Sequence, residues 1–191
     1  MPLLDVIDMS HSFGGLQAVS NYNLKLSPGQ ISGLIGPNGA GKTTIFNLIT
    51  GIYKPDEGEV RLEGTDVVGQ RTNQIAAKGI GRTFQEMRLW RHMTEQEHVK
   101  MARYSKLSYG LFGAFLDSPK RRREEEASTE LAMDYMELFG VRQFADQLVV
   151  NLPYGAQRRV EMARALAMEP KVLLLDEPTV GMTPEEMVDM I

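Results

Sequence analysis

The sequence predicts an α/β core with an antiparallel β subdomain and an inserted α-helical lobe, on three observations. Apolar and polar residues alternate at 22–26 and 59–63, which is the period-2 pattern of half-buried strands. Residues 31–35 and 172–175 are short apolar runs, each followed by glycine or by acidic residues, as in parallel strands that are buried on both faces. Between residues 85 and 151 the apolar spacing becomes helical, for example at Leu131, Tyr135, Leu138 and Phe139.

These patterns predict a discontinuous core, residues 1–86 and 166–191, around a helical lobe, residues 87–165. Residues 183–186, TPEE, form a capping box with proline at the first helical position, so a helix is expected to begin there. Only about two turns of chain follow that start. We therefore expect the chain to be truncated at its C-terminus.

Composition excludes several classes of protein. No apolar run approaches the roughly 18 residues of a membrane-spanning helix, and Asp5 lies where a signal peptide would carry Lys or Arg. The chain has no cysteine, which excludes a disulfide scaffold, a zinc-thiolate site and thiol catalysis. A net charge of −4 gives no global attraction for nucleic acid or anionic lipid. The sequence therefore predicts a cytosolic globular protein in which any site for a polyanion is local.

A phosphate-binding loop is predicted at residues 36–43, GPNGAGKT, which match G-x-x-x-x-G-K-[ST]. The glycines let backbone N–H groups point inward, Lys42 supplies a charge for the β- and γ-phosphates, and the Thr43 hydroxyl can bind Mg²⁺. A glycine-rich turn that binds nothing is the alternative, but the apolar run before the loop and the helical run after it favour a P-loop NTPase (RecA-like) core. The expected nucleotide-binding residues of the loop are Asn38, Gly39, Ala40, Gly41, Lys42, Thr43 and Thr44.

Two acidic residues, Asp176 and Glu177, follow the second apolar run. Ligands of open α/β sheets bind at the carboxyl ends of strands, which is also where the phosphate loop is expected. We expect Asp176 to hold a water of the magnesium ion and Glu177 to deprotonate the attacking water. The alternative is a solvated strand end that leads into the turn at Pro178.

Four further stretches resemble motifs of the ATPase subunits of ABC transporters. Gln85 resembles the glutamine of the Q-loop, which contacts Mg²⁺, and Phe13 matches the aromatic residue that stacks on adenine. Residues 152–159, LPYGAQRR, lie where that family has its LSGGQ signature, and residues 180–183 lie at the D-loop position. The resemblance implies ATP and Mg²⁺ as cofactors, with Glu177, Lys42 and Gln85 as catalytic residues and Thr43, Gln85 and Asp176 around the metal.

The resemblance also implies a head-to-tail dimer that binds ATP between its two subunits. Pro153, Tyr154 and Gly155 would then approach the γ-phosphate held by the second ATPase subunit, because a helix N-terminus attracts anions. Pro153 replaces the serine of the signature and Ala156 replaces its glutamine, which we interpret as a subfamily variant. The switch histidine of the family follows the D-loop, whereas His11, His92 and His98 all precede Asp176.

Residues 79–85, 151–167 and 177–186 are most similar to the ATPase subunits of importers for branched-chain amino acids and related amides. This resemblance implies a Mg²⁺-dependent ATPase coupled to transport, peripheral to the cytoplasmic face of the bacterial inner membrane. Transmembrane permease subunits would dock near residues 85–90, and a periplasmic binding protein would act indirectly. Nucleic acid is not an expected partner.

Two other functions stay open. A soluble ABC-type ATPase that acts on nucleic acid or ribosomes usually carries two nucleotide domains or a coiled coil, and this chain has one phosphate loop and no sustained heptads. The other is a nucleotide-binding module without turnover, because the expected truncation would leave the chain inactive on its own.

Three surface features each allow two interpretations. Residues 120–126, KRRREEE, could bind anionic lipid, but their charges pair at i, i+4 and predict a solvated helix start. Residues 110–116 could dip into a membrane, although packing in the helical lobe is favoured. Trp90 could anchor a cytoplasmic helix of a membrane subunit or be buried in the lobe.

Overall fold

The computed structural model describes residues 1–83, 90–106, 119–178 and 180. The chain divides into two compact units, which are treated separately. An α/β unit comprises residues 1–82 and 171–176, and a helical unit comprises residues 83–170 and 177–191. The sequence-predicted boundaries at 86/87 and 165/166 remain a prediction.

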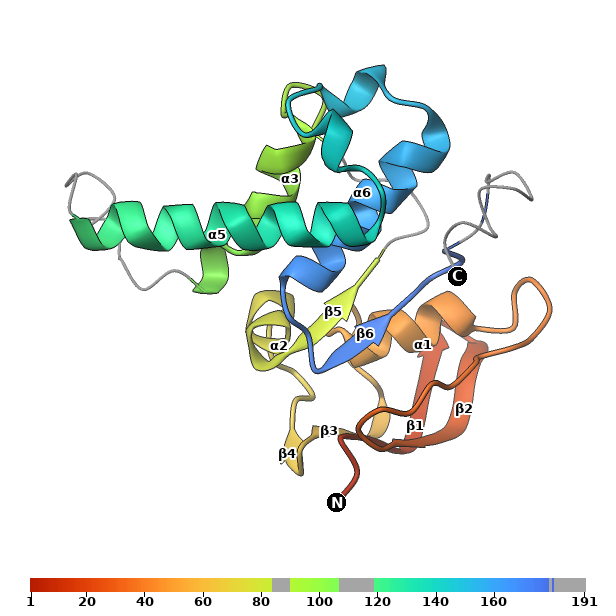
Figure 1. Ribbon diagram of the computed structural model, residues 1–191. Helices are drawn as coiled ribbons and strands as arrows, with labels where there is room; N and C mark the ends of the chain where they lie inside the picture. Colours follow the sequence, from red (N-terminus) through yellow and green to blue (C-terminus); the bar gives the residue numbers. More distant parts are fainter. Residues whose placement is uncertain (84–89, 107–118, 179, 181–191) are drawn as a thin grey trace. The chain divides into compact units, whose positions relative to one another are not determined.

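An antiparallel sheet begins the α/β unit (Figure 1). Its strands are β1 (Leu4–Phe13), β2 (Leu16–Leu26), β3 (Glu57–Leu62) and β4 (Thr65–Asp66), in the order β2-β1-β3-β4. The predicted alternation is confirmed in β2, where Tyr22, Leu24 and Leu26 are partly buried and their neighbours are exposed, and in β3, where Val60 and Leu62 are buried. The antiparallel subdomain expected from the sequence is therefore present.

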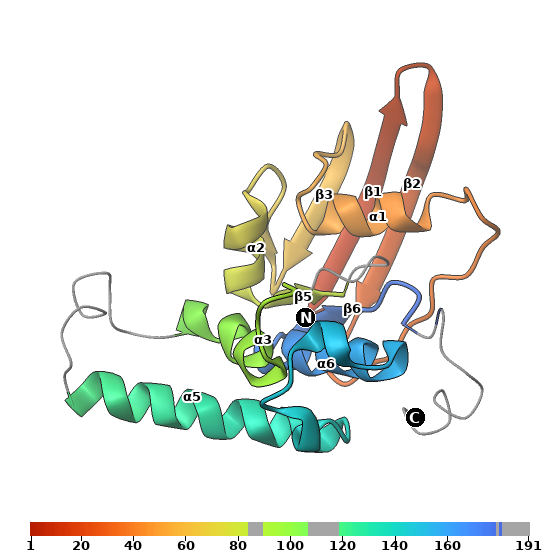
Figure 2. The same cartoon turned by 90° about the horizontal axis from the view of Figure 1, so that it is seen from above.

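Helix α1 (Lys42–Ile49) covers one face of this sheet, as Figure 2 shows. Its apolar side contributes Ile45, Leu48 and Ile49 to the core, at the spacing that one helical face requires. The sheet supplies apolar side chains from β1, β2 and β3 to the same core. Its other buried members include Leu4, Val6, Met9, Val19, Val60, Leu62, Ile75, Ile80, Val172 and Leu174.

A second, parallel sheet of the same unit pairs β5 (Ile80–Arg82) with β6 (Val172–Leu174), in register Ile80↔Val172. Helix α2 (Thr72–Lys78) leads into β5 through Gly79, whose φ of 114° suits the end of a helix. The parallel strand predicted at 172–175 is thus confirmed over its first three residues.

The buried strand predicted at residues 31–35 is wrong. These residues have no regular secondary structure, and Ile31 and Ile35 are 98% and 94% exposed. A parallel strand exists only where neighbours accept and donate its backbone hydrogen bonds, and among the described strands of the α/β unit none pairs with this run. An apolar sequence alone therefore did not determine a strand.

In the described part of the helical unit, three α-helices pack against one another: α3 (Glu95–Ala102), α5 (Pro119–Leu138) and α6 (Tyr154–Ala167). Short 3₁₀ turns are η1 (Tyr104–Lys106), η2 (Arg142–Phe144) and η3 (Val149–Asn151). The helical character predicted after residue 85 is confirmed for these segments. The buried apolar side chains form a separate core of Val99, Ala132, Met136, Val141, Ala145, Val149, Leu152, Ala156, Val160, Ala163 and Ala167.

The predicted apolar stripe of α5 is confirmed in part, because Tyr135 and Phe139 pack against the core of the helical unit and Leu138 does not. Ser128, Ala132 and Met136 are buried, whereas Leu138 is 68% exposed. The predicted stripe consists of large apolar residues, but a helix that packs closely against two other helices buries small residues where the helices touch. At the start of α5, Lys120 and Arg121 form the predicted i, i+4 ion pairs with Glu124 and Glu125.

Within the described residues, no helix is both long and apolar enough to cross a membrane.

A buried carboxyl group lies in the first turn of α3. Glu95 is 0% exposed and neither of its carboxyl oxygens has a hydrogen-bond partner. Burial raises the pKa of Glu95 to about 8, against the positive charge of Arg159, which lowers it. Between pH 4.5, the ordinary pKa of the group, and pH 8, Glu95 is therefore protonated in the folded protein and ionised in the unfolded chain. The free energy of unfolding falls as the pH rises through this range.

Replacement of Glu95 by Gln should remove this loss of stability, since the amide has no charge to desolvate. At pH 8 we expect the free energy of unfolding to rise by about 2–4 kcal/mol, and at pH 4 to change little. Urea unfolding at both pH values measures it. Glu130→Gln, on the exposed face of α5, is the control. If Glu95→Gln raised the free energy of unfolding equally at pH 4 and pH 8, Glu95 would not be the group whose ionisation destabilises the protein.

Candidate nucleotide-binding site

The phosphate loop leads directly into α1, and two of its glycines are required by their backbone conformation. Gly39 and Gly41 have φ of 83° and 81°, in the left-handed region that other residues rarely adopt. A Cβ atom on Gly41 would lie 2.5 Å from the carbonyl oxygen of Ala18 in β2. The loop can therefore take this course between β2 and α1 only with glycine at position 41.

Lys42, the first residue of α1, folds back over the loop. Its Nζ donates to the carbonyl oxygens of Gly36 at 2.7 Å and Pro37 at 2.9 Å, so the ammonium group lies inside the curve of residues 36–42. Residues 38–40 are exposed, and the exposed Thr43 follows in the first turn of the helix. The loop thus gathers a positive charge, a helix N-terminus and a hydroxyl group around one exposed position, which is what a phosphate chain requires.

Asp176, just after β6, is tied to α1 through Arg82 of β5. Arg82 Nη2 donates to Asp176 Oδ2 at 2.9 Å, and both side chains are buried, at 5% and 7% exposure. Arg82 Nη1 also donates to Asn47 Oδ1 at 2.6 Å, and its guanidinium group lies 5.5 Å from the centre of the Phe46 ring. One arginine therefore fixes the carboxyl end of β6 relative to the phosphate-loop helix.

The side chains present are compatible with Mg²⁺. This ion keeps several waters and is usually bound through one or two carboxylates together with substrate phosphates, rather than by a protein cage. The described residues contain no group of three or more His, Asp or Glu side chains that is placed to hold a metal ion, and they offer the exposed hydroxyl of Thr43 and the carboxylate of Asp176. Arg82 Nη2 donates to Asp176 Oδ2, and each carboxylate oxygen has two lone pairs, so a carboxylate can accept from an arginine and from a metal-bound water together.

Phe13, the predicted adenine-stacking residue, ends β1 in a cluster of three aromatic rings. Its ring meets those of His11 and Tyr53 edge-on, at centroid distances of 4.7 Å and 5.3 Å, while His11 and Tyr53 stack at 5.8 Å. Asp56 lies beside the ring of His11 and accepts the N–H of Ser12. Phe13 remains 45% exposed, so its orientation is fixed while its ring stays accessible to a nucleotide base.

The signature residues begin helix α6 in the helical unit. Pro153 is the N-cap and is exposed, Tyr154 is 40% exposed, and Gly155 is buried in the first turn. The Tyr154 hydroxyl donates to the carbonyl oxygen of Val180 at 3.1 Å. Glu177 belongs to this unit as well and has a left-handed backbone, with φ of 48°.

Some predicted residues fall outside the described part of the chain. These are Gln85, residues 110–116, the D-loop beyond Val180 and the capping box at residues 183–186. Trp90 lies within it and is 51% exposed, so it is not buried in the lobe. Its backbone N–H donates to Nε2 of the buried His98, and the guanidinium group of Arg164 lies 5.9 Å from the centre of its ring.

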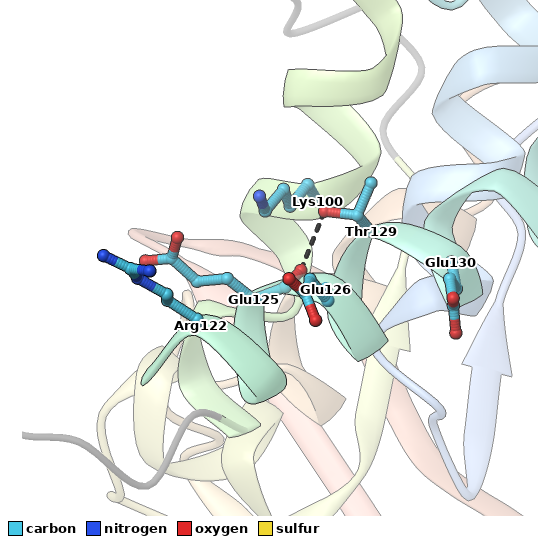
Figure 3. A pocket seen from close by; sticks show the side chains of 6 residues that line it. All are labelled: Lys100, Arg122, Glu125, Glu126, Thr129 and Glu130. Atoms are coloured by element: carbon cyan, nitrogen blue, oxygen red, sulfur yellow. Dashed lines mark hydrogen bonds between the residues drawn. The ribbon is translucent and has the colours of Figure 1, made fainter. Parts of the chain in front are cut away.

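A surface pocket of about 350 Å³ lies between α3 and α5 (Figure 3). Lys100 comes from α3, and the other lining side chains come from α5: Arg122, Glu125, Glu126, Thr129 and Glu130. The Thr129 hydroxyl donates to the carbonyl oxygen of Glu125 within the helix. Three glutamates would repel phosphate, and the pocket contains none of the predicted nucleotide-binding residues.

Sequence reasoning did not identify three residues that organise these sites: Arg82, Tyr53 and Arg158. Arg82 lies 94 positions from Asp176, and no local pattern indicates a pair so far apart. Tyr53 lies after the end of α1, where the sequence has no apolar periodicity that would indicate its contact with Phe13. Arg158 resembles a surface arginine in a charged helix, yet only 1% of its side chain is exposed.

The family model described as ABC transporter matches residues 19–180. The high-affinity branched-chain amino acid transport ATP-binding protein LivG of Escherichia coli K12 is 45% identical over 185 residues, which cover 97% of this chain and 72% of LivG.

Solved structures agree with the family match. The ADP conformation of MJ1267, an ATP-binding cassette of an ABC transporter, has a TM-score of 0.81 at 30% identity and covers 99% of this chain and 74% of MJ1267. The dimeric structure of MJ0796, a bacterial ABC transporter cassette, has a TM-score of 0.80 at 25% identity, with 98% and 79% covered. The family model covers most of the chain, and the relatives are similar to it over nearly its whole length. The phosphate loop that surrounds Lys42 agrees with both findings. The chain therefore belongs to the ATP-binding cassettes of ABC transporters.

Proposed function

We propose that this chain is the subunit that binds and hydrolyses ATP, with Mg²⁺, in an importer of branched-chain amino acids or related amides. The geometry of residues 36–43 supports nucleotide binding most directly, because the loop, the Lys42 ammonium group and the start of α1 surround one exposed position. The substrate class rests on the similarity to LivG, whose name states branched-chain amino acid transport.

In this proposal the residues of the α/β unit hold the nucleotide. Backbone N–H groups of residues 38–44 and the Lys42 ammonium group bind the phosphates, and Phe13 stacks on the adenine. Thr43, Asp176 and Gln85 hold Mg²⁺, which supplies charge for the developing oxyanions when it is bound. Glu177 accepts the proton of the attacking water.

We further propose a head-to-tail dimer in which Pro153, Tyr154 and Gly155 approach the γ-phosphate bound by the second subunit. The start of α6 suits this role because an N-cap proline leaves the first N–H groups of the helix without a side-chain acceptor. The dimeric structure of MJ0796 is consistent with such an assembly. Permease subunits would dock near residues 85–90, where half of the Trp90 surface is exposed, at the cytoplasmic face of the membrane.

Transport of leucine tests the substrate class. In proteoliposomes that contain the full-length protein with its permease subunits and periplasmic binding protein, we expect ATP-dependent uptake of radiolabelled leucine and none of lysine. A cationic side chain should be rejected because an apolar site cannot compensate its charge. Equal uptake of both amino acids, or ATPase activity that RNA or ribosomes stimulate and leucine does not, would contradict the proposal.

A further inference from the structure

The first turns of α6 hold the backbone that follows Asp176 by its carbonyl groups. Arg158 Nη2 donates to the carbonyl oxygen of Glu177 at 2.9 Å, and Arg158 Nε donates to that of Pro178 at 3.2 Å. One turn earlier, the Tyr154 hydroxyl donates to the carbonyl oxygen of Val180. Hydrogen bonds from one helix therefore hold the carbonyl groups of Glu177, Pro178 and Val180.

Arg158 is an unusual residue to find at such a position, because it is buried together with its counter-ion. Arg158 Nη1 donates to Glu161 Oε2 at 2.5 Å, and each side chain is 1% exposed. Removing two charges from water costs several kcal/mol per ion, and an apolar pair of similar volume is often as stable or more so. The fold alone therefore does not require an ion pair here, whereas holding two carbonyl groups in fixed directions requires a forked donor.

The residue held in this way has a strained backbone. Glu177 has φ of 48°, and a non-glycine residue in the left-handed region costs about 1–3 kcal/mol and persists only where its surroundings impose the conformation. Arg158 binds the carbonyl groups of Glu177 and of the next residue, so it fixes the peptide units on the C-terminal side of the strained position. The direction in which the Glu177 side chain leaves the backbone follows from that constraint.

We propose that Arg158, with Glu161 as its counter-ion, is a positioning residue that holds the backbone of Glu177 so that its carboxylate is oriented for hydrolysis. The inference rests on the proposed function, in which Glu177 is the general base. It adds a connection between two sites. In the proposed dimer the N-terminus of α6 approaches the γ-phosphate of the second subunit, and Arg158 of the same helix orients Glu177 of its own subunit. A displacement of α6 on nucleotide binding would be passed to Glu177 through Arg158.

The paired replacement Arg158→Met with Glu161→Leu tests this inference in the full-length protein. Both charges of the pair disappear together, and Arg164, whose Nη2 lies 4.0 Å from Glu161 Oε1, keeps 16% of its side chain exposed to water, so the fold should persist. We expect kcat to fall about 10- to 100-fold, the loss typical of a misplaced catalytic group, while the KM for ATP and the melting temperature stay close to those of the parent. Arg158→Lys retains the charge but not the fork, and should give an intermediate kcat.

Arg103→Met is the matched control, because Arg103 donates to the carbonyl oxygen of Ala167 at the opposite end of α6. It should leave kcat unchanged. Parental kcat in both the paired variant and Arg158→Lys would overturn the inference, and so would a raised KM with kcat unchanged. Failure of the proposed function is distinguishable, since the parent itself would then hydrolyse no ATP.

Discussion

Glu177→Gln is expected to lower kcat for ATP hydrolysis about 10²–10⁴-fold while MgATP still binds. The amide has nearly the shape of the carboxylate and the same backbone contacts to Arg158, but it cannot accept a proton from water. Because nucleotide binds and is not consumed, the variant should accumulate as an ATP-bound dimer. Steady-state ATPase assays and size-exclusion chromatography with and without MgATP measure the two effects in the full-length protein.

Glu169→Gln is the control for this variant, because Glu169 is also a glutamate with a left-handed backbone, at φ 50°, and lies in no predicted site. Its ATPase activity should equal that of the parent. Hydrolysis at the parental rate by Glu177→Gln would show that another group is the base. It would leave the assignment of the phosphate loop intact.

Lys42→Ala is expected to weaken MgATP binding about 100-fold or more, beyond detection by equilibrium dialysis. The ammonium group is the one side-chain charge that the loop places inside its own curve, and hydrogen bonds to charged groups contribute about 1.5–3 kcal/mol each. The carbonyl groups of Gly36 and Pro37 would turn to water, so the stability of the α/β unit should change little. Equilibrium dialysis measures the MgATP affinity, and thermal unfolding of the same preparation measures the stability.

Lys25→Ala removes an exposed lysine from β2 and should leave ATP affinity unchanged. If Lys42→Ala bound ATP as tightly as this control, the phosphate loop would not be the nucleotide site, and the proposed function would fail with it.

Sequence patterns predicted the elements that carry a clear local pattern of apolar residues or glycines. The alternation in β2 and β3 is local, and so is the glycine-rich loop that leads into α1, which explains why both were predicted correctly. The candidate site residues follow from motifs of fixed spacing. Their roles remain predictions.

What escaped prediction depends on distant partners. The apolar run at 31–35 has a strand-like composition, but a strand also needs hydrogen-bonded neighbours, which composition does not reveal. The contact face of α5 depends on how closely its neighbours approach, which favoured Ser128 and Ala132 over Leu138. Likewise Arg82 and Arg158 acquire their roles only when residues 176–178 reach them.

The pairing of β5 with β6 also sets an order of events during protein synthesis. Strand β5 ends at Arg82 and its partner begins at Val172, so the whole interval between them must be translated before the parallel sheet can form. At about 5–20 residues per second, roughly 90 residues take on the order of 5–20 s. During that time β5 lacks the strand it pairs with in the folded protein, and Arg82, although Asn47 is already present, lacks Asp176. Nascent chains on neighbouring ribosomes could pair with such an edge, so slow translation of this interval would favour misassembly.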